Sequence, residues 1–357
     1  MTLGLPVVLV IPSKGIAETI GALVRGFLAH RPGWIPLGIL ATQTGSDRHG
    51  DILARTLERE GLPPLIGTIP RNEKLTLPER HLGLVTRWEL ERDGTLQTFR
   101  SILDRCSDGW DWERLSGHFV SSLPASDSPG VRSNPVTGNI RLGVAWDDAF
   151  RFYYHENFSA LEERGVDIVC FSPLKDPFLP ADLDGLYFGG GYPEVFSRGL
   201  SENRSFLDSL AAFARTGKPI YAECGGMLYL TEGPMEETVR WSGLIPCRFR
   251  MKERLKRLGY VEATPSGGHF LSSGKGSIRG HLFHYSELVF SGGESTLPGE
   301  PAFFVPDEAE GFSLGNIVAS YLHLYFPSNP SVLDSWLHAL SVASRKRRSS
   351  GSVHRSL

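Results

Sequence analysis

The sequence has few cysteines, little net charge and no long hydrophobic run. Its four cysteines are irregularly spaced, which excludes a disulfide-rich secreted scaffold and paired CxxC zinc knuckles and favours a reducing cytoplasm. With a formal net charge of -3 and no basic patch interleaved with aromatics, we expect small-molecule ligands and no nucleic acid. The apolar run at residues 3–11 stops at Pro12 and is too short to span a bilayer, so we expect a cytoplasmic protein without a membrane segment.

Short apolar runs alternate with amphipathic stretches in the first third of the chain. In chain order, these runs and stretches are residues 6–11, 18–29, 35–41, 51–60 and 65–69. Strand-like runs separated by helical patterns are typical of βαβ units, in which a parallel sheet is buried on both faces. We therefore predict a first α/β domain at residues 1–120.

A change of composition separates this domain from a second one. Residues 121–139 are rich in turn formers and have no apolar period, which predicts a linker. The strand and helix patterns resume at residues 141–145, 154–164, 167–171, 185–188, 203–216 and 219–222. They predict a second parallel-sheet α/β domain at residues 140–340. The basic, Ser-rich residues 341–357 are expected to form a disordered tail.

The sharpest local motif surrounds Cys224. An apolar strand at residues 219–222 runs towards this cysteine, and Gly225, Gly226 and a helix-like apolar stretch follow it. The pattern is typical of a nucleophile elbow, where small neighbours relieve crowding at a tight strand-to-helix turn and the helix N-terminus favours the thiolate. The alternative interpretation is a buried core cysteine, and Cys-Gly-Gly alone does not separate the two.

Two further features supply what a nucleophile needs. The glycines at residues 189–191 end an upstream strand, where backbone N–H groups can approach an oxyanion, although a flexible turn is the alternative. His323 ends a strand-like run at residues 316–322, where the carboxyl edge of a sheet would hold a base for the thiol. A lone histidine there is more often a satisfied core residue. The combination, rather than any one motif, points to catalysis.

The order of these segments resembles the class I glutamine amidotransferases and, more closely, the cobyrinic acid a,c-diamide synthase family. In the second domain the resemblance rests on residues 145–154, 171–176, 189–194, 221–226, 279–286 and 319–323. In the first domain it rests on residues 5–10, 70–73 and 77–84, which are less specific. Nearly all of residues 3–340 is covered.

The resemblance implies a fold and a site. It implies two doubly wound parallel-sheet domains, the first an incomplete P-loop NTPase-like (dethiobiotin synthetase-like) domain and the second a flavodoxin-like class I amidotransferase. It also implies that Cys224 attacks the glutamine amide, that N–H groups near Gly191 and Gly225 stabilise the oxyanion, and that His323 protonates departing ammonia. Further oxyanion or pocket residues by position are Gly190, Tyr192, Glu194, Tyr285 and Ser286.

The implied overall reaction amidates the a and c acetates of cobyrinic or hydrogenobyrinic acid with ammonia from glutamine, using ATP and Mg²⁺. Full-length relatives carry a P-loop before the point that matches Leu5, and the pattern G-x-x-x-x-G-K-[ST] does not occur in this sequence. We therefore expect residues 1–120 to lack most of the nucleotide site, which a homodimer or a second chain would supply while covering an exposed sheet edge. The alternative is a non-catalytic or glutaminase-only remnant that binds a partner chain or a tetrapyrrole.

The group that orients the histidine is missing from its usual place. Broader class I enzymes have a carboxylate two residues after the histidine, and here that residue is Tyr325, so the resemblance implies a Cys-His dyad. Glu223 adjoins the nucleophile, but adjacent strand residues point to opposite faces. His281 and His284 are not expected to bind metal, because an i, i+3 pair in a strand diverges and no third ligand of recognisable spacing follows.

Overall fold

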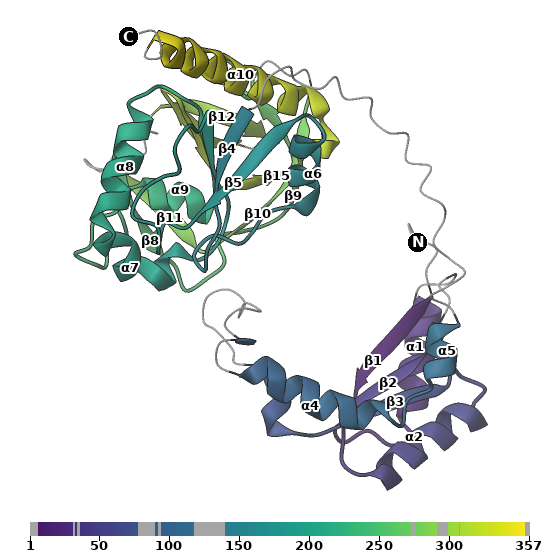
Figure 1. Cartoon of the computed structure of the whole chain (residues 1–357). Coiled ribbons are helices and arrows are strands. Elements are labelled where there is room, and N and C mark those ends of the chain that lie inside the picture. Colours follow the sequence, from purple (N-terminus) through teal and green to yellow (C-terminus); the bar gives the residue numbers. More distant parts are fainter. Residues whose placement is uncertain are drawn as a thin grey trace. The chain divides into compact units, whose positions relative to one another are not determined.

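The computed structural model describes residues 6–30, 33, 36–77, 90–91, 94–117, 140–272, 276–290, 299–306 and 308–353 (Figure 1). The chain forms two compact units, Met1–Gly130 and Val131–Leu357. The linker predicted at residues 121–139 lies outside the described residues, as does most of the segment 77–84. Within the described ranges, no helix is both long enough and apolar enough to cross a membrane.

The first unit contains the parallel sheet that its alternating sequence predicts. Its strands, in sheet order, are β1 (Val7–Pro12), β2 (Pro36–Thr44) and β3 (Leu65–Pro70), all parallel. Its helices are α1 (Ile20–His30), α2 (Asp47–Arg59), the 3-10 turn η1 (Glu73–Leu75), α4 (Thr95–Ser107) and α5 (Trp112–Ser116). The core holds aliphatic side chains from β1, β2, α1 and α2, including the fully buried Ile39 and Leu53. Burial of these apolar surfaces stabilises the unit.

The second unit is built on a ten-stranded mixed sheet with the order β15-β10-β9-β12-β13-β14-β7-β6-β4-β5. Its first strands along the chain are β4 (Ile140–Ala145), β5 (Val166–Phe171), β6 (Gly185–Phe188) and β7 (Ile220–Glu223). The later strands are β9 (Arg257–Pro265), β10 (Ile278–His284), β12 (Glu300–Val305), β13 (Glu308–Leu314), β14 (Ile317–Ser320) and β15 (Leu322–Leu324). A separate antiparallel pair consists of β8 (Cys247–Met251) and β11 (Ser286–Phe290).

The mixed sheet corrects the prediction of a wholly parallel second domain. Strands β14, β7, β6, β4 and β5 are parallel, whereas β15, β10, β9, β12 and β13 extend the sheet in antiparallel pairs. In the described residues after β8 no α-helix occurs before α10, and parallel strands need long crossovers that are usually α-helical. Connections without an α-helix favour antiparallel pairing of the strands that they join.

Helices cover both faces of the parallel part of this sheet (Figure 1). The helices are α6 (His155–Glu162), α7 (Ser197–Glu202), α8 (Arg204–Ala214), α9 (Gly225–Leu230) and α10 (Pro330–Val353), with 3-10 turns η2 (Pro193–Phe196) and η3 (Phe326–Ser328). Trp336 of α10 packs edge-on against Tyr187 of β6, with ring centroids 5.6 Å apart. Phe206 of α8 packs against Phe171 of β5, which in turn contacts Phe188. Because Tyr187 and Phe188 are consecutive in a strand, the two helices lie on opposite faces.

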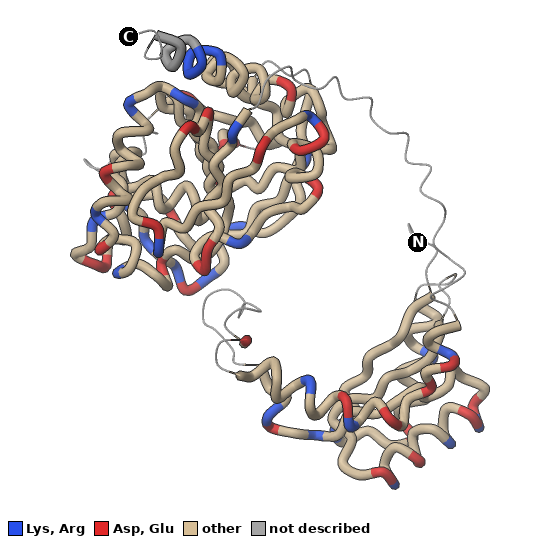
Figure 2. Tube along the Cα trace, in the orientation of Figure 1, with Lys and Arg blue, Asp and Glu red and all other residues tan. Residues whose placement is uncertain are grey.

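Residues 341–353 of the predicted disordered tail are helical instead. Helix α10 continues through Val353, and Figure 2 shows the basic run at residues 345–348 near its end. Ala343 and Ser344 are buried, and the Arg347 guanidinium contacts the fully buried Asp184 carboxylate at 2.9 Å. Together with Leu340, these residues recur at helical spacing on the face that packs on the sheet. Packing and the ion pair therefore keep this segment helical despite its polar composition.

Candidate active site

Cys224 lies at a sharp turn between β7 and α9. Its backbone has φ 49° and ψ -111°, a conformation that a residue with a side chain rarely adopts. The Cys224 N–H donates to the Ser320 carbonyl of β14 at 2.7 Å, and the thiol contacts the Phe283 carbonyl at 3.7 Å. A Cβ at Gly226 would lie 2.3 Å from the Phe188 carbonyl oxygen, so the turn needs glycine there. This is the geometry of a nucleophile elbow.

The glycine loop after β6 lies against this turn and against His323. A Cβ placed on Gly225 would be 2.9 Å from the Gly191 nitrogen, and a Cβ on Gly190 would be 2.2 Å from the His323 Cε1 atom. Such close approaches are possible only because the three residues lack side chains. The structure thus brings the cysteine turn, the predicted oxyanion loop and the histidine together, although they are far apart in the sequence.

His323 lies in β15, paired with His281 of β10. The two imidazole rings stack with centroids 4.4 Å apart and planes 4° from parallel. The His281 Nδ1 atom in turn lies 2.7 Å from the Tyr154 hydroxyl. In the described residues no group of three or more His, Cys, Asp and Glu side chains is placed to hold a metal ion. The stacked ring restricts rotation of His323 from one side.

Burial favours the uncharged forms of both Cys224 and His323. It raises the pKa of the Cys224 thiol to about 12, the charges of Glu194 and Glu223 raise it further, and the Gly225 N–H opposes the rise. Burial also lowers the pKa of His323 to about 3, with smaller contributions from two neighbouring histidines. A thiolate favoured by the helix N-terminus was the expectation, but desolvation is the larger effect at this turn. If Cys224 is the nucleophile and His323 its base, as predicted, proton transfer to His323 has to accompany attack.

The other predicted pocket residues fall into two groups. Tyr192 and Glu194 follow the glycine loop, with the Tyr192 ring packed edge-on against Phe152 and Glu194 close enough to affect the pKa of Cys224. Tyr285 lies between β10 and β11, and Ser286 begins β11. The buried Ser286 hydroxyl donates to the Tyr321 hydroxyl at 3.0 Å. Ser286 therefore has a partner within the core, whereas Glu194 lies within electrostatic range of the Cys224 thiol.

Glu223 is the residue that sequence reasoning excluded. Its Oε2 atom lies 3.8 Å from the Nδ1 atom of His323, and both side chains are buried. Strand alternation does not separate Glu223 from Cys224, because the positive φ of Cys224 ends the strand between them. The sequence does offer one indication of its role: Tyr221 lies two residues before Glu223 and so on the same face of β7. The Tyr221 hydroxyl donates to the Glu223 carboxylate at 2.7 Å.

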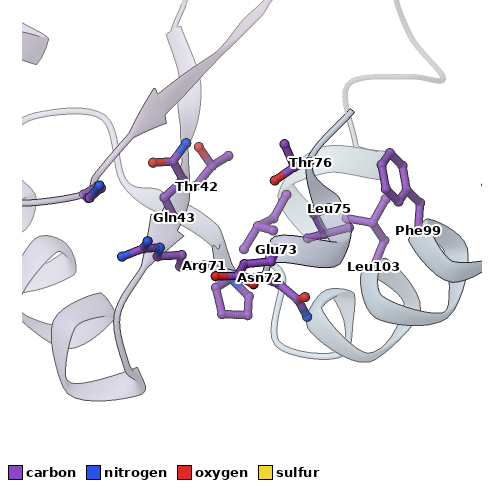
Figure 3. Close-up of a pocket in the computed structure, with 12 residues that line it drawn as sticks. Thr42, Gln43, Arg71, Asn72, Glu73, Leu75, Thr76, Phe99 and Leu103 are labelled. Atoms are coloured by element: carbon purple, nitrogen blue, oxygen red, sulfur yellow. The ribbon is translucent and has the colours of Figure 1, made fainter. Parts of the chain in front are cut away.

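The first unit has a pocket of about 530 Å³ at the carboxyl ends of its strands. Figure 3 shows Gln43 and Arg71 on one side of it, with Phe99 and Leu103 of α4 opposite. Gln43 has φ 58°, so its backbone is strained where β2 approaches its end. The carboxyl edge of a parallel sheet is where α/β folds bind ligands.

Comparison with known proteins places this site in a family. Residues 141–331 match the CobB/CobQ-like glutamine amidotransferase domain. The cobyrinate a,c-diamide synthase of Syntrophotalea carbinolica is 39% identical over 339 residues, which cover 91% of this chain and 72% of the relative. That of Dehalococcoides mccartyi (strain CBDB1) is 37% identical over 352 residues, 94% of this chain and 74% of the relative. A solved structure of PurLQS from Thermotoga maritima covers 57% of this chain and 99% of its own, with 17% identity and a TM-score of 0.42.

The domain match and the site define the second unit as a glutamine amidotransferase domain. The chain as a whole belongs to the cobyrinate a,c-diamide synthase family, because its similarity to those enzymes extends through both units. The resemblance that the motifs indicated is thereby confirmed.

Proposed function

We propose that this chain is an ATP- and glutamine-dependent ligase that amidates the a and c acetates of cobyrinic or hydrogenobyrinic acid in cobalamin biosynthesis. The observation that carries the proposal is the convergence of Cys224, the 190–191 loop and His323 in a chain of this family. Its four cysteines are free and it draws on ATP, so we assign the reaction to the cytoplasm.

We infer that glutamine hydrolysis starts when the Cys224 sulfur attacks the side-chain amide carbon while His323 takes the thiol proton. The carbonyl oxygen becomes an oxyanion, which the N–H groups of Gly191 and Gly225 stabilise. When the C–N bond breaks, His323 returns the proton to the leaving nitrogen and ammonia departs, which leaves a thioester. Water, deprotonated by His323, then cleaves the thioester, so glutamate leaves and the thiol is restored.

The synthase half uses the ammonia. ATP phosphorylates an acetate carboxylate, ammonia attacks the acyl phosphate, and phosphate leaves as the amide forms. We assign this half to residues 1–120 as part of a P-loop NTPase-like domain, and the 140–340 domain to a flavodoxin-like amidotransferase. Because the 357 residues contain no G-x-x-x-x-G-K-[ST] pattern, we propose that groups outside them, such as those of a second chain, complete the phosphate site. No described cluster fits a resident Mg²⁺, so no step is assigned to it.

The test is to incubate the purified chain with glutamine, ATP, Mg²⁺ and cobyrinic acid, and to measure glutamate enzymatically and the corrinoid by mass spectrometry. The proposal predicts glutamate release by this chain, and a diamide product when a chain that completes the phosphate site is added. Glutamate without diamide would restrict the activity to the glutaminase half. Absence of both glutamate and diamide would overturn the proposal.

A further inference from the structure

The buried carboxylate of Glu223 lies beside the Nδ1 edge of the His323 ring. Its Oε2 atom is 3.8 Å from Nδ1, and the exposed fractions of the two side chains are 1% and 6%. If Nδ1 carries the proton and directs it at Glu223, Nε2 has the free lone pair that can accept the thiol proton. Catalytic hydrogen bonds are often long without substrate and shorten in the reacting complex.

Three donors fix this carboxylate. Tyr221 donates to Oε1 at 2.7 Å and Tyr187 donates to Oε2 at 2.8 Å. The Leu324 N–H donates to Oε1 at 3.0 Å. Leu324 directly follows His323, so this last bond ties the backbone that carries the histidine to the carboxylate. Glu223 therefore anchors the backbone of β15 and lies beside the His323 ring.

The other described contacts of the His323 ring are a stacked histidine and a glycine, which do not hydrogen-bond to its nitrogens. One face of His323 is covered by the stacked His281 ring, and Gly190 approaches the Cε1 atom closely. Tyr325, two residues after the histidine, packs edge-on against Tyr154 with centroids 5.3 Å apart. It provides no carboxylate at the position where broader class I enzymes have one.

We propose that Glu223 is the positioning residue of the amidotransferase site: it selects the His323 tautomer and stabilises the imidazolium that forms when Cys224 attacks. The proposal rests on the glutaminase function proposed above. An imidazolium in a desolvated site is costly without a negative charge beside it. Glu223 thus completes a Cys-His-Glu triad from the residue before the nucleophile.

Ionisation of Glu223 gives the proposal a measurable signature. Burial raises its pKa to about 7, while Tyr221, Leu324 and Tyr187 act in the opposite direction. The titratable groups that face Glu223 or the histidine are Cys224, Tyr153, Tyr154, Tyr187, Tyr221, His281, His284 and His323. Burial raises the pKa values of Cys224 and the four tyrosines and lowers those of the three histidines below their usual 6.5, so an acidic limb of activity near pH 7 points to Glu223.

The experiment measures kcat and KM for glutamate release, with pH profiles, in the wild-type chain and in Glu223→Gln. The amide keeps the volume and an acceptor oxygen but removes the charge. We expect kcat to fall on the order of 10³-fold with KM within about twofold, and the acidic limb to disappear. Glu310→Gln is the matched control, because Glu310 is also a buried carboxylate of this unit but accepts from the Tyr321 N–H. Its kcat should stay within about threefold of wild type.

A kcat for Glu223→Gln within about tenfold of wild type, with an unchanged pH profile, would overturn the positioning role. If that variant does not fold, Tyr187→Phe decides, since loss of this donor should move the acidic limb to higher pH, and an unmoved limb refutes the proposal. Absence of Cys224-dependent glutamate release from the wild-type chain would instead contradict the proposed function itself.

Discussion

Replacing Glu223 by glutamine should change how the stability of the amidotransferase unit depends on pH. The pKa of Glu223 is raised from 4.5 to about 7 in the folded state, mainly by burial. Between these values the folded state binds more protons than the unfolded chain, so the wild-type free energy of unfolding falls as pH rises through this window and is level above it. The difference corresponds to about 3 kcal/mol, because one pKa unit is about 1.4 kcal/mol.

Glutamine carries no such proton, so Glu223→Gln should lack this decline. Urea unfolding at about pH 5 and about pH 8.5, followed by the fluorescence of the buried Trp336 and Trp241, measures the two free energies. Between the lower and the higher pH, the free energy of unfolding of the variant should rise by about 3 kcal/mol relative to that of the wild type. A wild-type–variant difference that is the same at both pH values would refute the burial argument. The charge that positions the histidine would then have no cost to the fold.

Three further changes test other parts of the structure. Gly190→Ala places a Cβ 2.2 Å from the Cε1 atom of His323 and should lower glutaminase kcat by about 10²-fold while circular dichroism is unchanged. Gly267→Ala, with nothing within 4 Å of its Cβ, should leave kcat unchanged. Because burial raises the pKa of Cys224 to about 12, iodoacetamide should alkylate it more slowly than the exposed Cys170 at neutral pH, as read by mass spectrometry; faster labelling would contradict a neutral resting thiol. Arg347→Ala should lower the free energy of unfolding by about 3 kcal/mol in urea, because the buried Asp184 loses its ion-pair partner. An unchanged free energy of unfolding would mean that this end of α10 has no structural role.

The parallel strands could be predicted because they are short, largely apolar runs, of which β6 and β7 are wholly buried. The predicted strand at residues 185–188 coincides with β6, and the one at 167–171 begins one residue after β5 begins. The antiparallel extension was missed since its strands do not show such runs. In β9, for example, Leu258 and Tyr260 are 69% and 91% exposed, so apolar residues point to solvent rather than mark the core.

Two local features could not be predicted for related reasons. In α10 the inward positions 343, 344 and 347 include a serine and an arginine, residues that are typical of a solvated tail. Only the structure shows that the buried Asp184 pairs with Arg347. Glu223 was excluded by strand alternation, which does not apply across a residue with φ 49°. Cys224 and His323 remain the predicted nucleophile and base. The structure adds the Glu223 carboxylate beside His323, where strand alternation did not predict it.

The most direct test of the account compares glutamate release from glutamine by the wild-type chain, Cys224→Ala and the matched cysteine variant Cys170→Ala, each with and without ATP and cobyrinic acid. The account predicts release by the wild-type chain and by Cys170→Ala and none above background by Cys224→Ala. Equal release by Cys224→Ala, or none by the wild-type chain under any condition, would contradict it.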